Sequence, residues 1–314
     1  SELIWLARYQ YLKERGYLVR QRYRPGWAPT WKVRPDLTEI LCEDSIRITN
    51  PSLLDAQRIS DGLFVMLKEV HSSSSEAFIA RFLSSELLRN DPRNHAVPVL
   101  DVFPDPLDDK KVLLVFPLLR HVQKPPFLSI PEALDLIEQT LEGLVFLHEH
   151  EVAHRDCALG NIMMDARAMY PVPWHPQSPS LDQGNRMIMN IKSRTDVGGV
   201  RYFFTDFGLS SKGEGKTVGF DGIERAPELS YNIPYDPYRL DVYILGKQYQ
   251  ALLFDNFVNV GFLHPLINQM ITQDPNNRPS AAEAYTIFVE MRARLNPGWF
   301  SRRLRTKDEG ATIA

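Results

Sequence analysis

The chain has 314 residues, a net charge of −3, and a composition of 44% hydrophobic and 24% charged residues. These values are typical of a globular protein with a large core, and the length suits one large domain or two small ones. The nearly neutral charge does not favour nucleic acid or an anionic membrane as a partner. Two cysteines cannot build a disulfide framework, which indicates a reducing intracellular compartment, cytoplasmic or nuclear.

Residues 1–37 are predicted to form an N-terminal helix followed by an arm rich in Trp and Pro. Apolar residues recur at helical spacing over residues 2–15, and Gly16 is a natural stop. The stretch from Arg20 to Pro35 should be extended and irregular. Neither a basic leader nor an apolar run of the ~20 residues that a membrane span needs is present, so neither a signal peptide nor membrane association is predicted.

The next region, residues 38–120, is predicted to be a small sheet-rich domain with one helix. Alternating apolar residues predict short strands, and an Asp-Gly pair within residues 53–69 predicts a hairpin turn. An apolar stripe predicts a helix over 76–88. The predicted strands are Thr38–Cys42, Ser45–Thr49, Leu53–Ile59, Leu63–Glu69, Val97–Val102 and Val112–Phe116.

Residues 121–297 are predicted to be mainly helical, beginning with a helix over Glu132–His150. Within this region, residues 166–200 are rich in proline and polar side chains and predict a long surface insertion. Residues 298–314 should form a basic, solvated tail. The pattern therefore predicts an α+β protein whose sheet-rich first part joins a helical second part near residues 117–130.

A short polar cluster carries the clearest chemical signal. His154-Arg155-Asp156 is followed by Asn161, and an Asp-Phe-Gly triplet begins at Asp206, after the apolar run Tyr202–Phe204. Mg²⁺ prefers a few hard oxygen ligands and shares its remaining positions with substrate phosphates. An Asp with an Asn five residues later, and a second Asp after a strand, can therefore orient a hydroxyl group and hold two Mg²⁺ ions.

In this order the motifs resemble those of the protein kinase superfamily, whose catalytic loop and metal-binding triplet have the same pattern. The resemblance covers residues 63–290 and implies a two-lobed fold, with a small sheet-rich N-lobe containing one helix and a mainly helical C-lobe. The other matching motifs are Val65-Met66-Leu67-Lys68, Glu86 on the predicted helix, Ala226-Pro227-Glu228, Asp241-Val242-Tyr243-Ile244-Leu245-Gly246 and Arg278.

The resemblance implies a role for each catalytic match. Asp156 would accept or orient the attacking hydroxyl, while Asn161 and Asp206 would carry the Mg²⁺ ions. Lys68 would hold the α and β phosphates of ATP while paired with Glu86. The residues implied at the adenine side of the nucleotide site are Met66, Phe116 and Leu119.

Two further matches imply structural roles. Asp241 would support the backbone of the catalytic loop, and Glu228 would form an ion pair with Arg278. For the pairing with Lys68, Glu76 on the same predicted helix competes with Glu86. Three flanking segments narrow the resemblance to kinase-like proteins abundant in mushroom-forming (basidiomycete) fungi: residues 22–31, 161–165 and 169–176.

Three departures from the kinase pattern leave the activity open. Residues 46–54, where that family has a Gly-rich hairpin over the phosphates, contain no glycine, and Pro51 lacks an N–H donor. Met66 stands where a small residue above the adenine ring is usual. Ala158 stands where Ser/Thr kinases place a lysine, and the stretch 241–278 is short.

The leading hypothesis is an ATP- and Mg²⁺-dependent phosphotransferase that modifies Ser/Thr hydroxyls on a protein substrate. The first alternative is a pseudokinase that serves as a scaffold or regulator, motivated by the missing glycines and by Met66. The second is a kinase-fold enzyme for a small molecule, motivated by Ala158 and by the short region after Asp241. The oligomeric state cannot be read from the sequence.

Overall fold

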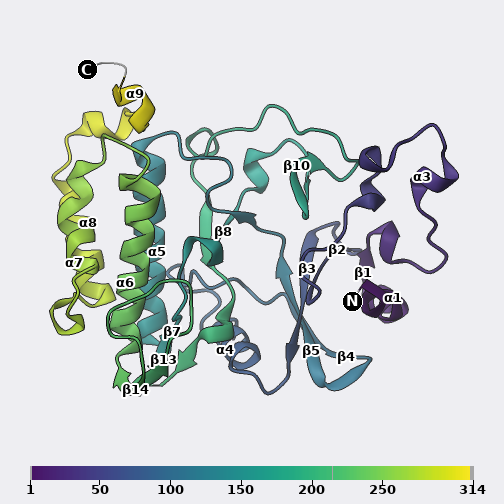
Figure 1. Ribbon diagram of the computed structural model, residues 1–314, viewed down its shortest axis with the longest axis horizontal. Helices are drawn as coiled ribbons and strands as arrows, with labels where there is room; N and C mark the ends of the chain where they lie inside the picture. The colour runs from purple at the N-terminus through teal and green to yellow at the C-terminus, as the bar shows by residue number, and fades with distance from the viewer. Residues whose placement is uncertain (1, 214, 312–314) are drawn as a thin grey trace. The chain divides into compact units, whose positions relative to one another are not determined.

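The computed structural model describes residues 2–213 and 215–311 (Figure 1). Helices and antiparallel strands occur together in it, in agreement with the predicted α+β class. The described residues form two compact units, called unit 1 and unit 2 below. Unit 1 comprises residues 2–78, 98–119 and 166–192, and unit 2 comprises residues 79–97, 120–165, 193–213 and 215–311.

A five-stranded antiparallel sheet in the order β1-β2-β3-β5-β4 is the central element of unit 1 (Figure 1). Alternation along β3 sends Val65 and Leu67 into the core, whereas Lys68 lies on the other face. The predicted hairpin over residues 53–69 is confirmed. The strands are β1 (Tyr17–Val19), β2 (Leu53–Arg58), β3 (Phe64–His71), β4 (Asp101–Asp105) and β5 (Asp108–Pro117).

The N-terminal residues of unit 1 contribute to the core of this sheet. The single helix predicted over residues 2–15 is divided at Arg8 into two short helices. Trp5 and Leu12, one on each helix, are fully buried against the strands. The two helices are α1 (Glu2–Ala7) and α2 (Tyr9–Glu14).

Residues 20–52, which connect β1 to β2, differ from the prediction. The strands predicted at 38–42 and 45–49 are wrong, because local hydrogen bonds replace sheet pairing there. The N–H of Cys42, for example, donates to the carbonyl of Glu39 at 3.0 Å, and the N–H of Ser45 donates to the carbonyl of Cys42 at 3.1 Å. The connection contains η1 (Gln21–Tyr23), α3 (Thr30–Val33), η2 (Glu39–Leu41) and η3 (Glu43–Ser45).

The predicted surface insertion, residues 166–200, is partly core. Its residues 166–192 belong to unit 1, where Tyr170 and Trp174 are buried with ring centroids 5.2 Å apart. The prediction fails because prolines and polar residues dominate the composition, while a few large aromatic side chains still reach the core. The elements of this part are η5 (Arg167–Met169), β9 (Trp174–His175) and β10 (Ser178–Asp182).

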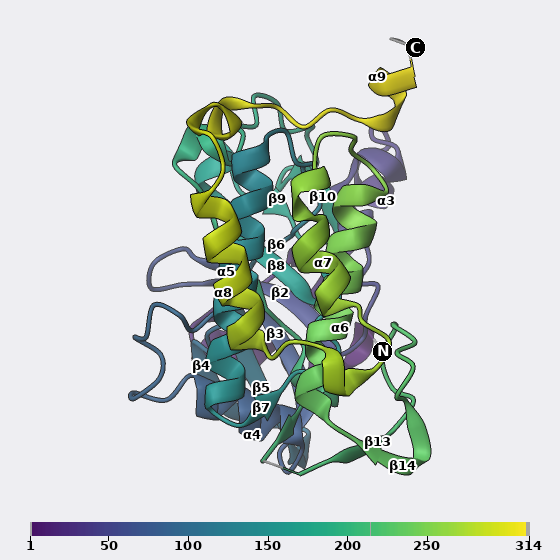
Figure 2. The ribbon, with the colours of Figure 1, turned by 90° about the vertical axis from the view of Figure 1, so that its left-hand side faces the viewer.

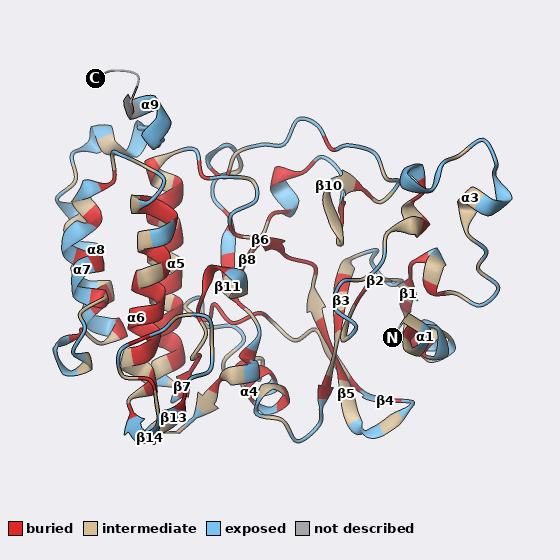
Figure 3. Ribbon diagram, viewed as in Figure 1, coloured by how far each residue is buried: buried red, intermediate tan, exposed pale blue. Residues whose placement is uncertain are grey.

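Unit 2 is built on long helices that lie side by side (Figure 2). Helix α5 packs against both α6 and α8, and most of its length is buried, which Figure 3 shows in red. The helix predicted over 132–150 is confirmed as α5. The α-helices of this unit are α5 (Ile130–Glu149), α6 (Pro237–Tyr249), α7 (His264–Met270), α8 (Ala281–Ala293) and α9 (Lys307–Ala311), while α4 (Ser75–Leu83) begins in unit 1 and ends in unit 2.

Short strands and turns connect these helices. The strands are β6 (Arg120–His121), β7 (Val152–Ala153), β8 (Ile162–Asp165), β11 (Arg201–Phe204), β12 (Ser211–Lys212), β13 (Thr217–Gly219) and β14 (Ser230–Tyr235). They pair as β11-β8-β6, β12-β7 and β13-β14. The 3₁₀ turns are η4 (Leu159–Asn161), η6 (Thr195–Val197), η7 (Phe207–Leu209), η9 (Gly261–Leu263), η10 (Pro275–Asn277) and η11 (Pro297–Ser301), and η8 (Gln250–Phe254) is a π-helix.

The basic C-terminal segment is not simply solvated. Leu304 is only 5% exposed, and β-bridges join Ser129 to Arg303 and Phe257 to Thr306. The described part of this segment is therefore packed on unit 2, because its single leucine has apolar surface to bury. No helix within residues 2–213 and 215–311 is both long and apolar enough to cross a membrane.

Candidate functional site

The loop that carries Asp156 is held by a buried carboxylate from α6, as the sequence predicts. Asp241 is fully buried and accepts hydrogen bonds from the backbone N–H groups of His154, at 2.8 Å, and Arg155, at 2.6 Å. Two consecutive N–H groups converge on one carboxylate because Arg155 has a φ of 66°. A positive φ is costly for a residue other than glycine, so the charged hydrogen bonds offset local strain.

Asn161 fixes the carboxylate of Asp156. Its Nδ2 donates hydrogen bonds to the carbonyl oxygen and to Oδ2 of Asp156, both at 2.8 Å. The other carboxylate oxygen, Oδ1, accepts a hydrogen bond from the backbone N–H of Ile223 at 3.3 Å. Because the amide group of Asn161 uses its nitrogen toward Asp156, its side-chain oxygen is the atom suited to a metal ion.

Asp206 lies beside Asn161 because of the pairing of β8 with β11. β8 begins at Ile162, which pairs with Phe204 at the end of β11. Thr205 then donates hydrogen bonds to the Asn161 carbonyl from its N–H, at 2.8 Å, and from its hydroxyl, at 3.1 Å. Asp206 is exposed, and its left-handed backbone lets Oδ1 accept a hydrogen bond from Gly208. The structure thus joins Asp156 to Asn161 directly and places the backbone just before Asp206 against Asn161.

His154 is a packed histidine and not a general base. Its ring lies near Phe204 and Phe207 and is fully buried. Nδ1 accepts a hydrogen bond from the Asp156 N–H at 3.3 Å, so Nε2 must donate to the carbonyl of Thr205 at 3.1 Å. Burial lowers the pKa of His154, although the nearby carboxylates act in the opposite direction. The ring is therefore neutral and holds the loop.

Cys157, beside the loop, is not an activated nucleophile. Its side chain is fully buried, and its Sγ donates to the carbonyl oxygen of Asp241 at 3.2 Å. Burial raises the pKa of the Cys157 thiol well above its ordinary value. A thiol that stays protonated is a poor nucleophile, so Cys157 serves packing.

In unit 1, Lys68 pairs with Glu76 and not with Glu86. Lys68 Nζ lies 2.5 Å from Glu76 Oε1, and both side chains are largely buried. The predicted helix over 76–88 ends at Leu83, so Glu86 lies beyond α4. The Glu86 side chain is 91% exposed and lies 4.0 Å from Arg89. The pairing predicted for Glu86 is therefore wrong, because the helix is too short to include it.

Three further residues share the sheet face of Lys68. The register of β2, β3 and β5 places Asp55 opposite Met66 and Met66 opposite Phe116. Met66 and Phe116 are half-buried, whereas Asp55 is buried. Leu119, just after β5, is also buried. A carboxylate beside Met66 on this face is a feature that the motif search missed.

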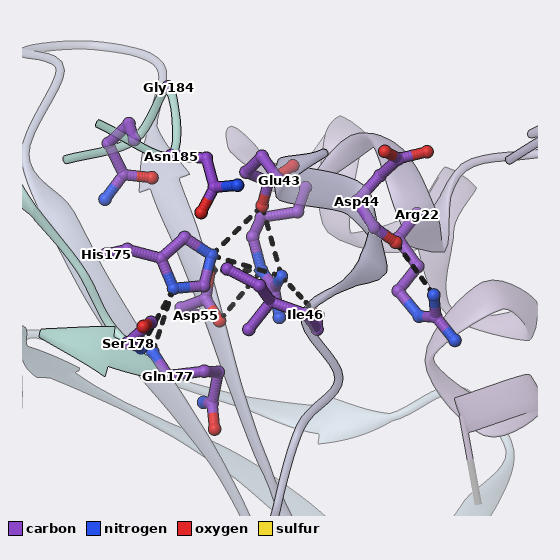
Figure 4. Close-up of polar contacts among 12 residues, drawn as sticks. Arg22, Glu43, Asp44, Ile46, Asp55, His175, Gln177, Ser178, Gly184 and Asn185 are labelled. Carbon is purple, nitrogen blue, oxygen red and sulfur yellow. Dashed lines mark hydrogen bonds and ion pairs between the residues drawn. The ribbon is translucent and has the colours of Figure 1, made fainter. Parts of the chain in front are cut away.

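Asp55 belongs to a buried polar cluster that joins the 20–52 connection to the 166–192 insertion (Figure 4). Arg20 Nε lies 2.9 Å from Asp55, and Arg20 Nη1 lies 3.1 Å from Glu43. His175 Nε2 lies 3.1 Å from the same Glu43 oxygen, while its Nδ1 accepts hydrogen bonds from the N–H groups of Gln177 and Ser178. The insertion is therefore bound to the connection.

Burial and pairing have opposite effects on the two carboxylates of this cluster. Burial raises the pKa of Asp55 above its ordinary value, although Arg20 acts to lower it. For Glu43, burial also acts to raise the pKa, but the hydrogen bonds and charges of His175 and Arg20 outweigh it and lower the pKa. Of the two carboxylates beside Arg20, Glu43 is therefore the one more strongly favoured in its charged form.

Residues 46–54, where the kinase family has its Gly-rich hairpin, do not form a hairpin in this structure. Residues 20–52 separate β1 from β2 in the sequence, although the two strands are paired. Residues 46–52, just before β2, are not in a strand. Instead, Arg20 Nη1 donates to the carbonyl of Ile46 at 2.8 Å, and Gln177 Oε1 accepts from the N–H of Thr49 at 3.3 Å. Side chains from distant segments thus hold the chain before β2.

The predicted ion pair between Glu228 and Arg278 is confirmed. Arg278 Nη1 and Nη2 lie 2.6 and 3.2 Å from the two carboxylate oxygens of Glu228. Arg278 also donates to the carbonyls of Arg239 and Thr272, so its buried charge is well satisfied. The pair joins the segment that ends at Glu228 to the chain before α8.

The motif search also missed Gln248. This buried residue lies on α6 two turns after Asp241, on the same helix face. Its side chain contacts both Leu159 in the loop and Glu224. A polar residue two helical turns after Asp241, in a helix that is otherwise largely apolar, is the sequence signal that could have revealed Gln248.

The donor atoms at Asn161 and Asp206 fit Mg²⁺. An amide oxygen and a carboxylate are hard ligands, and Mg²⁺ usually takes few of them from protein. In the described part of the chain, no three His, Cys, Asp or Glu side chains are arranged to hold a metal by themselves. A metal ion at this site would therefore take its remaining ligands from water or from phosphate oxygens.

The chain has a distant relative among characterised proteins. No protein-family model matches it. Over 160 residues it is 26% identical to the serine/threonine-protein kinase dst1 of Dictyostelium discoideum. The match covers 50% of this chain and 21% of the relative, so it spans about a fifth of the length of that protein. The similarity supports a kinase-like relationship.

Proposed function

We propose that this chain is a protein-kinase-like phosphotransferase, which transfers the γ-phosphoryl group of ATP to a Ser or Thr hydroxyl of a protein substrate. The observation that carries the proposal is the arrangement in which the Asn161 amide orients the Asp156 carboxylate, while Thr205, which precedes Asp206, is hydrogen-bonded to the Asn161 carbonyl. The buried pair of Lys68 and Glu76 and the similarity to a Ser/Thr kinase support it.

Each residue has a role that follows from its contacts. Asp156, oriented by Asn161, would accept the hydrogen bond and the proton of the attacking hydroxyl. Asn161 and Asp206 would hold Mg²⁺, which neutralises phosphate charge when bound. Lys68, oriented by Glu76, would bind phosphate oxygens. Positioning and charge neutralisation supply most of the rate in phosphoryl transfer, so these roles need no covalent intermediate.

The second candidate is a pseudokinase scaffold that does not use ATP. The observation that favours it is the sheet face around Lys68, where the bulky Met66 lies beside the buried Asp55. Because Asp55 is already paired with Arg20 at 2.9 Å, the bulk of Met66, which would narrow the space for a base, is what disfavours a nucleotide here. The absence of glycine in residues 46–54 acts in the same direction.

We further propose that the protein acts in a reducing intracellular compartment, cytoplasmic or nuclear. Cys42 and Cys157 are both buried as thiols, which supports this proposal. From the flanking segments, we also propose that the chain is related to the kinase-like proteins of basidiomycete fungi.

A thermal-shift titration with Mg-ATP tests the leading proposal against the second. A ligand at about 100 times its Kd adds about 2.7 kcal/mol to the free energy of unfolding. We expect wild type to be stabilised by Mg-ATP and the Asp206→Asn variant to be stabilised much less. Asp255→Asn, which removes an exposed carboxylate elsewhere in unit 2, is the matched control and should behave as wild type. No stabilisation of wild type at millimolar Mg-ATP would favour the scaffold.

A further inference from the structure

Both polar atoms of the Gln248 side chain are used, and they contact two different segments. Oε1 accepts a hydrogen bond from the N–H of Leu159 at 3.0 Å, and Nε2 donates to Glu224 Oε1 at 2.5 Å. Gln248 is only 8% exposed, so each bond lies in a setting where its loss leaves a polar group poorly solvated. Leu159 lies in the loop between Asp156 and Asn161.

The segment at the other end borders Asp156 directly. Residues 219–228 are called the acceptor-side segment here. Ile223, next to Glu224, donates its N–H to Asp156 Oδ1 at 3.3 Å. A Cβ on Gly222 would lie 3.2 Å from Asp156 Oδ1 and 3.3 Å from the Arg155 carbonyl, so the segment lies closer than most side chains would allow. Gly222 also has a φ of 89°, which favours glycine.

We infer that Gln248 is a positioning residue that holds the acceptor-side segment in register with the loop of Asp156. Through Glu224 it places Ile223 and Gly222 against the Asp156 carboxylate, and through Leu159 it holds the loop itself. If the proposed function holds, Gln248 thereby sets the gap through which the acceptor hydroxyl reaches Asp156. The role of Gln248 in catalysis rests on that proposed function.

Glutamine suits this position because it is neutral and offers both an acceptor and a donor. Replacing it with glutamate would keep the acceptor for Leu159 but set two carboxylates against each other at Glu224. Exchanging the two side chains restores complementarity, because the carboxylate then lies on α6 and the amide on the acceptor-side segment. The double variant Gln248→Glu/Glu224→Gln should therefore recover what the single variant Gln248→Glu loses.

The test combines hydrogen–deuterium exchange with transfer kinetics. Exchange is measured for peptides of the acceptor-side segment and of residues 154–161 in wild type, Gln248→Glu and the double variant. Gln269→Glu, at an exposed position of α7, makes the same chemical change elsewhere in unit 2 and is the control. Phosphoryl transfer from Mg-ATP is measured on the same proteins.

We expect amide exchange in the acceptor-side segment to rise by about tenfold or more in Gln248→Glu, and to return toward wild type in the double variant. Transfer should fall through kcat with little change in the KM for ATP, and should recover in the double variant. The inference is overturned if Gln248→Glu exchanges like Gln269→Glu, or if the double variant is no better than the single. Absent transfer in wild type would refute the proposed function, while the exchange pattern would still decide the coupling.

Discussion

Lys68 and Glu76 form a largely buried ion pair whose shortest distance is 2.5 Å, with one partner on β3 and the other in the first turn of α4. The pair lies within unit 1, and the helix that carries Glu76 ends before Glu86. The geometry therefore gives Glu76 the role that the motif spacing assigns to Glu86.

Substitutions at Lys68, Glu76 and Glu86 should separate these two assignments. Lys68→Ala should lower transfer by about 100-fold, since it removes a donor to developing charge. Glu76→Gln should lower it less, because the amide still bonds but no longer neutralises the ammonium group. Glu86→Gln, at an exposed site, should match wild type in steady-state kinetics with ATP. Loss of activity in Glu86→Gln but not in Glu76→Gln would contradict this assignment.

Truncating Met66 should strengthen nucleotide binding. Met66 lies between Asp55 and Phe116 on the sheet face of Lys68, so Met66→Ala removes bulk where the adenine ring is expected. We expect the Kd for Mg-ATP, measured by calorimetry, to fall severalfold. Met187→Ala, which truncates an exposed methionine of unit 1, is the control and should leave the Kd unchanged. Weaker binding in Met66→Ala would show that Met66 packs on the base.

Removing one partner of the Arg278–Glu228 pair should be strongly destabilising. Arg278 is buried, and Glu228 is nearly so, so Glu228→Gln leaves a buried cation without its counter-charge. The expected loss in the free energy of unfolding is about 3–5 kcal/mol. Glu290→Gln breaks the exposed pair with Arg294 and should cost less than about 1 kcal/mol. Similar midpoints for both variants in chemical denaturation would refute the structural role.

The pH dependence of stability should reflect the neutral ring of His154. Burial lowers its pKa in the folded state, whereas the unfolded chain takes up the proton near pH ~6.5. The stabilising effect is therefore fully present above pH ~6.5 and is lost as pH falls through the lower, folded-state pKa. Histidine ¹⁵N NMR should show His154 neutral and protonated on Nε2 at pH 7. A charged ring at that pH would contradict the hydrogen-bond assignment.

Local sequence pattern and motif spacing were sufficient to predict many of the secondary-structure elements. The hairpin of β2 and β3 follows from alternation and an Asp-Gly turn, and α5 follows from its apolar stripe. Asp156 and Asn161 lie five residues apart in one loop, whereas Asp206 follows only after the 166–200 insertion, so its association with them came from the motif match and not from local spacing. The anchoring of the loop by Asp241 was also predictable, because it accompanies the same motif.

Features that depend on tertiary packing were not predictable. Where α4 ends decides between Glu76 and Glu86, and spacing alone does not show the last turn. Arg20 and His175 lie 155 positions apart in the sequence yet approach to 3.3 Å, and no local pattern indicates that contact. Such long-range contacts help hold part of the Pro-rich insertion in unit 1.

The most direct test of the central claim is incubation of the chain with Mg²⁺, γ-labelled ATP and generic protein substrates, followed by mass spectrometry. Wild type and Asp156→Asn are compared, because Asp156 is the residue to which the hydroxyl proton is assigned. The phosphotransferase account predicts label on Ser or Thr residues with wild type and at most a trace with Asp156→Asn. Equal label with both proteins, or none on any protein with wild type, would contradict it.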